Sequence, residues 1–127
     1  MPEQPLPEGL HWDLWLGTAP ERPYNRGYTP FDWRGWWAFG SGALGDMGPH
    51  CMDPVFFALQ LEDATEYSVE VVRQEGVTEE CPPTQSLLKF SFPARRALAP
   101  VDVYWYDGGL MPERPKDIPQ DVPLGDG

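Results

Sequence analysis

The chain has 127 residues, enough for one domain with a hydrophobic core but too few for two ordinary domains. Its formal net charge of −11, with no basic cluster, argues against nucleic acid as a partner. No stretch approaches the roughly 18 apolar residues of a membrane span, and the first residues lack the basic and apolar regions of a signal peptide, so we expect a soluble, cytoplasmic protein without membrane association.

Residues 1–41 show little periodicity and carry two aromatic clusters, at 11–15 and 31–37. Prolines and glycines are frequent around these clusters. The segment is therefore predicted to be a long, structured but irregular loop that packs through its rings rather than through regular secondary structure.

A helix is predicted over residues 45–61, because an apolar stripe recurs there at helical spacing. The stripe consists of Met47, Cys51, Val55 and Leu59, with Met52 and Phe56 alongside. Since proline is tolerated only in the first turn of a helix, Pro49 places the helix start near Asp46, at or beside the N-cap. Pro54 falls inside the helix and is expected to kink or restart it.

Residues 67–107 are predicted to form a sheet, because the apolar period falls to two. Three stretches alternate, at 67–71, 88–92 and 101–105, and are expected to pair antiparallel. The proline-rich residues 110–127 are expected to be an extended tail. The whole chain, 1–127, is then a single α+β domain, in which an open-faced, mainly antiparallel sheet carries the helix and the aromatic loop on one face.

The alternation assigns the strand residues to two faces. The face expected to meet the apolar stripe holds Leu88, Phe90, Phe92, Val101, Val103 and Trp105. The opposite face holds Glu70, Val72, Leu87, Lys89, Ser91, Tyr104 and Tyr106. Tyrosines flanked by aliphatic side chains are typical of interfaces, so we expect a homodimer that forms through this open face.

The two cysteines, Cys51 and Cys81, lie in unrelated sequence settings. They lack the paired spacing of a zinc site, and two cysteines cannot form a dense disulfide framework. We expect both to be free, buried thiols.

Gly40–Gly45 fits the dinucleotide-binding pattern G-x-G-x-x-G, and Glu62 and Asp63 lie near the acidic position expected about 20 residues further on. Such a pattern normally follows a buried strand rich in Val and Ile. Here it follows Arg34–Phe39, which is polar, aromatic and interrupted by glycine. We interpret the glycines as places where the chain passes close to a ligand or to another backbone, and expect no cofactor site in this chain.

Asp46, His50 and Asp53 are spaced by four and three residues, which places them on one face of the predicted helix. A carboxylate beside an imidazole stabilises the protonated ring, as a general acid–base histidine requires. The alternatives are that Asp46 is a plain N-cap, that His50 is a hydrogen-bonded core residue and that Asp53 is a solvated charge. A metal site is a third alternative, but it would need at least one further ligand, and His11 is not obviously near.

Residues 36–53 resemble the signature in the C-terminal domain of the Gfo/Idh/MocA oxidoreductases, NAD(P)-dependent enzymes that act on sugars and polyols. Further stretches resemble one branch of that family and occur in the same order along the chain as in the family. They lie at 9–17, 23–25, 31–35, 92–95 and 105–109. The resemblance implies an α+β substrate domain that works beside a Rossmann domain, which is absent from these 127 residues and would hold NAD or NADP.

The resemblance also implies that His50 accepts the proton of the reacting hydroxyl while Asp46 orients the sugar or the histidine. The family adds a lysine from a Glu-Lys-Pro motif, which neither Lys89 nor Lys116 matches. We therefore expect the substrate-binding half of a sugar or polyol oxidoreductase, inactive alone and completed by a Rossmann-domain partner. The alternatives are a stand-alone carbohydrate-binding or interaction module derived from that domain, and a truncated product without function.

The aromatic loop supplies candidates for the sugar pocket, because the C–H faces of sugars lie well on indole rings while their hydroxyls need polar partners. The candidate substrate-binding residues are Tyr24, Trp33, Arg34, Trp36 and Asp53. The alternative for each ring is that it simply pins the irregular loop to the helix.

Overall fold

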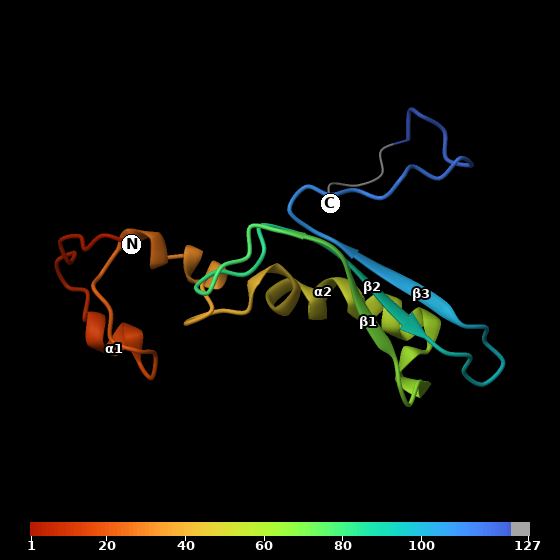
Figure 1. The fold of residues 1–127 in the computed structure, drawn as a ribbon, viewed down its shortest axis with the longest axis horizontal. Helices are drawn as coiled ribbons and strands as arrows, with labels where there is room; N and C mark the ends of the chain where they lie inside the picture. The colour runs from red at the N-terminus through yellow and green to blue at the C-terminus, as the bar shows by residue number, and fades with distance from the viewer. Residues whose placement is uncertain (123–127) are drawn as a thin grey trace. The chain divides into compact units, whose positions relative to one another are not determined.

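The computed structural model describes residues 1–122. Its longer elements are the helices α1 (Trp12–Leu16) and α2 (Gly42–Leu59) and the strands β1 (Ser68–Glu75), β2 (Gln85–Phe92) and β3 (Val101–Tyr106) (Figure 1). Short 3-10 helices lie at Arg26–Tyr28, Asp32–Gly35 and Leu61–Asp63. The elements form two compact units, which we describe separately. Unit 1 comprises Met1–Gly48 and Thr78–Pro82, and unit 2 comprises Pro49–Val77 and the residues from Pro83 onward.

The three strands form one antiparallel sheet in the order β1-β2-β3, and they lie side by side in Figure 1. Leu88 pairs with Trp105 and Phe90 with Val103, so the expected division of β2 and β3 into two faces is confirmed. The α+β fold is confirmed as well. The strands are longer than expected, since β1 continues to Glu75 and β2 begins at Gln85.

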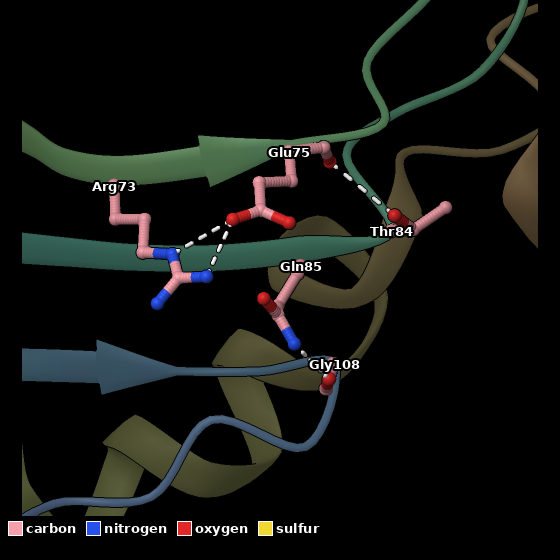
Figure 2. A network of polar contacts seen from close by, with 5 residues as sticks. All are labelled: Arg73, Glu75, Thr84, Gln85 and Gly108. Atoms are coloured by element: carbon pink, nitrogen blue, oxygen red, sulfur yellow. Dashed lines mark hydrogen bonds and ion pairs between the residues drawn. The ribbon is translucent and has the colours of Figure 1, made fainter.

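Strict alternation fails in β1, where the register shifts between Val71 and Arg73 and leaves Val72 as the extra residue of a bulge. Beyond the bulge, Arg73 pairs with Leu87 and Glu75 with Gln85. Figure 2 shows the polar network at this end of the sheet, in which the Arg73 guanidinium binds the Glu75 carboxylate. The amide of Gln85 donates to the carbonyl of Gly108 at 2.8 Å in the same network.

The expected start of α2 is wrong. The helix begins at Gly42, so Asp46 lies inside it rather than at its N-cap, Pro49 is well past the first turn, and the helix does not restart at Pro54. Gly42 packs so closely on Pro82 that an added side-chain carbon would lie 2.7 Å from it.

The expected packing of the apolar stripe is only partly right. Val55 and Leu59 are half-buried, but Met47 and Cys51 are exposed. Positions four apart drift by about 40° per step around a helix of 3.6 residues per turn, so a four-residue repeat rotates away from a fixed partner surface. The ring of Phe56 instead meets the buried Phe92 edge-on, with 5.9 Å between centroids.

The two cysteines are free, as expected, but the expectation that both are buried is wrong. Cys51 is exposed on α2, and Cys81 is only half-buried.

Unit 1 is organised around an aromatic cluster, as expected for the segment, although α1 and two 3-10 helices form within it. The cluster consists of Trp12, Trp15, Tyr24, Tyr28, Trp36 and Phe39. Two of its indoles are anchored by their N–H groups. Trp12 donates to the carbonyl of Arg22 at 2.8 Å, and Trp36 donates to that of Gly27 at 3.0 Å.

Residues 110–122 contain neither helix nor strand, as expected for the proline-rich tail, and its end, 123–127, lies outside the described residues. Within the described part of the chain, none of the helices is long and apolar enough to cross a membrane.

Candidate active site

In unit 1, Asp46 is held by Arg34. The Nε of Arg34 donates to Oδ2 of Asp46 at 3.1 Å, and one terminal nitrogen of the guanidinium donates to the carbonyl of Phe31 at 3.4 Å. The guanidinium carbon lies 4.4 Å from the ring centroids of both Phe31 and Trp33. The side chains of Arg34 and Asp46 keep 34% and 36% of their surface exposed. The carboxylate is therefore positioned by an immobilised cation and is still accessible to a ligand.

In unit 2, His50 and Asp53 lie on α2 three residues apart, and both are exposed. Phe57, four residues further along, is 83% exposed. The exposure of His50 excludes the alternative of a buried core histidine. This part of α2 presents an imidazole, a carboxylate and an aromatic ring to solvent. The boundary between the two units falls between Asp46 and His50.

Two of the candidate pocket residues lie inside the aromatic cluster. Tyr24 is buried and meets Trp12 edge-on at 5.2 Å, and its hydroxyl lies 3.5 Å from that of Thr29. Trp36 packs against Tyr28 at 4.9 Å. These positions give both rings a packing role, whereas Trp33 and Arg34 remain partly exposed.

Unit 1 contains two adjoining hollows. The first, which we call the aromatic hollow, has a volume of about 350 Å³ and is lined by Trp15, Leu16, Thr18, Ala19, Trp33, Ala38 and Phe39. The second, the polar hollow, has a volume of about 510 Å³ and is lined by Trp12, Asp13, Leu16, Gly17, Ala19, Glu21, Arg22 and Pro23. Leu16 and Ala19 line both. Of the candidate site residues, Trp33 lines a hollow, while Trp15 was missed despite its place in the first aromatic cluster.

The glycine pattern at Gly40–Gly45 does not fit a phosphate cradle. The segment before it holds the 3-10 helix Asp32–Gly35 instead of a buried strand. A side-chain carbon added at Gly40 would lie 2.6 Å from the Arg34 backbone, so the protein's own chain fills the space that a phosphate would need. The interpretation as close backbone approach is confirmed at Gly40.

Among residues 1–122, no group of three or more His, Cys, Asp and Glu side chains is arranged to hold a metal ion.

The chain matches the model of a known protein family. The model of the family described as "Oxidoreductase family, C-terminal alpha/beta domain", for the Gfo/Idh/MocA proteins, matches residues 1–88. This stretch is more than half of the chain and includes Asp46, His50, Asp53 and both hollows of unit 1. No curated protein matches the chain.

Proposed function

The chain belongs to the Gfo/Idh/MocA oxidoreductase family as its C-terminal α/β domain, and from this premise we propose that it is the substrate-binding half of an NAD(P)-dependent sugar or polyol dehydrogenase. The observation that carries the proposal is the Arg34–Asp46 pair, because it fixes a carboxylate at an accessible position on α2. The exposed His50 on the same helix supplies the proton acceptor.

Oxidation of an alcohol to a carbonyl removes a proton from oxygen and a hydride from carbon, and in this family the nicotinamide cofactor accepts the hydride when bound. In the proposal, His50 accepts the proton as general base. Asp46 accepts a hydrogen bond from a substrate hydroxyl and so fixes the orientation of the sugar. Asp53 and Trp33 contribute further contacts to the substrate. A nucleotide-binding partner domain holds the cofactor, since Gly40 of the glycine pattern packs against the chain's own backbone at Arg34.

Complementation tests this function. Mixed with a nucleotide-binding domain from a family member, the chain is expected to support sugar- or polyol-dependent reduction of NAD or NADP, followed by the absorbance of the reduced nicotinamide. Each component alone is the control and is expected to be inactive. If the mixture forms a complex and a broad panel of sugars and polyols gives no reduction, the catalytic proposal is wrong. Saccharide binding without turnover would instead favour the carbohydrate-binding module.

We also propose that two copies associate through the open face of the sheet. Tyr104 is exposed there, and its ring lies 6.4 Å from that of Tyr106. Beside the tyrosines, Asp102 accepts hydrogen bonds from Lys89 at 2.9 Å and Ser91 at 2.7 Å. The bond to Asp102 raises the pKa of Lys89, and the bonds from Ser91 and then Lys89 lower the pKa of Asp102. Because Lys89 and Asp102 already pair with each other, the tyrosines provide the apolar contact surface of this face.

Light scattering checks this association. The chain is expected to have the mass of a dimer at tens of micromolar, and the double variant Tyr104→Glu with Tyr106→Glu is expected to be a monomer, because carboxylates would be buried unpaired in the interface. Val69→Glu is the matched control, since Val69 pairs with Phe90 on the other face of the sheet. A monomeric wild-type chain would contradict the proposal.

A further inference from the structure

Two tryptophans of the aromatic hollow are arranged as platforms. Trp15 stacks on Trp12 with 4.7 Å between centroids and 14° between planes, and Trp33 carries the guanidinium of Arg34 at 4.4 Å. Each indole is thus supported by the protein while it remains half-exposed and lines the hollow. Supported, partly exposed indole surfaces in a shallow hollow suit the C–H face of a sugar ring.

The hollow is linked to Asp46 through two side chains. Trp33 forms part of its wall, Arg34 lies against that ring, and Arg34 binds Asp46. A ring seated in the hollow is therefore separated from Asp46 by these side chains and is not the ring that reacts there. At about 350 Å³, the hollow lies near the lower end of the range for ligand pockets, roughly 300–1,000 Å³, which suits one small ring.

The polar groups nearby suit a hydroxylated ligand better than an apolar one. The adjoining polar hollow is lined by Asp13 and Glu21, residues whose carboxylates accept hydrogen bonds. The Nε of Arg22, which also lines that hollow, is buried without a hydrogen-bond partner among residues 1–122. A buried donor of this kind is stabilised when an oxygen reaches it. Thr18 adds an exposed hydroxyl at the aromatic hollow.

We infer that the aromatic hollow is a second carbohydrate subsite, which holds a ring other than the one that is oxidised. The substrate is then a glycoside or an oligosaccharide rather than a free monosaccharide. The inference rests on the proposed function, because it takes Asp46 as the contact of the reacting ring. It adds the substrate class, which the family match leaves open.

Calorimetric titration of the full chain with cellobiose, maltose and lactose, each compared with glucose and galactose, tests the inference. At least one disaccharide is expected to bind tenfold or more tightly than either monosaccharide. Ala38→Leu, which fills the hollow, and Trp33→Ala, which removes one platform, are expected to abolish that difference. Trp37→Ala is the matched control, because Trp37 is an exposed tryptophan that lines neither hollow. A thermal unfolding curve for each variant shows whether the chain is still folded.

Equal affinities for disaccharides and monosaccharides in the wild-type chain would overturn the inference. So would a disaccharide preference that survives both Ala38→Leu and Trp33→Ala in folded protein. A third contrary result is that these variants weaken only the complex with the nucleotide-binding domain, which would make the hollow a docking surface between domains. In each case, turnover that depends on His50 would leave the proposed function intact, so the two failures are distinguishable.

Discussion

Replacing His50 with alanine is expected to lower sugar-dependent cofactor reduction by ~10²–10⁴-fold in the complemented enzyme, the usual loss when a general base is removed. The loss should appear in kcat more than in KM, because the proton moves only in the chemical step. His50 is exposed on α2, so its removal leaves no cavity and should leave thermal stability nearly unchanged. The measurement is steady-state kinetics beside a thermal unfolding curve for each variant.

His11→Ala is the matched control, because His11 is the other histidine of the chain and is also exposed. It is expected to retain full activity. Added imidazole should restore part of the activity of His50→Ala, since a diffusible base can replace the missing one, and it should do nothing for Asp46→Asn. Full activity of His50→Ala in a folded, complexed chain would show that another group accepts the proton.

The sheet was predictable from the sequence because a strand has a strict period of two. The alternation at 88–92 and 101–105 therefore assigned to one face residues that do pair across the strands, such as Phe90 and Val103. The bulge at Val72 was not predictable, because a register shift depends on the partner strand. The prediction of the start of α2 was wrong for a similar reason. The proline rule describes a local preference, whereas α2 begins at Gly42, which packs closely against Pro82, a residue distant in sequence.

The candidate site was predictable to the extent that it depends on helical spacing, which places Asp46, His50 and Asp53 on α2. The partner of Asp46 was not. The sequence suggests Arg34 as a substrate-binding residue, not as the partner of Asp46. No periodic pattern between residues 31 and 46 indicates that the side chains of Arg34 and Asp46 meet. The positions of the rings in the aromatic loop were not predictable either, because composition does not determine which ring is buried and which lines a hollow. Tyr24 is buried, whereas Trp15 lines one.

Arg95 is the residue of unit 2 whose loss is expected to cost most stability. Its side chain is buried, with 5% of the residue exposed, and its Nε and one terminal nitrogen both donate to the carbonyl of Leu59, at 2.9 and 2.6 Å. The other terminal nitrogen donates to the carbonyl of Ala99 at 3.0 Å. Arg95 therefore joins the last residue of α2 to the connection between β2 and β3, and its charge complements the negative end of the helix dipole.

Arg95→Ala is expected to lower the free energy of unfolding by about 3 kcal/mol, since hydrogen bonds of a charged donor are worth roughly 1.5–3 kcal/mol each and their acceptors would be left unpaired. That is a large share of a total of roughly 5–15 kcal/mol. Arg95→Lys should lose less stability because it keeps the charge, but it should still lose some because it cannot reproduce the planar fork of donors.

Arg96→Ala is the control. Arg96 is next in sequence, its side chain is 70% exposed, and its ion pair with Asp63 is expected to be worth about 1 kcal/mol or less. Urea unfolding of the three variants measures the differences, and a loss for Arg95→Ala no larger than that for Arg96→Ala would show that the buried guanidinium does not hold the end of α2 in place.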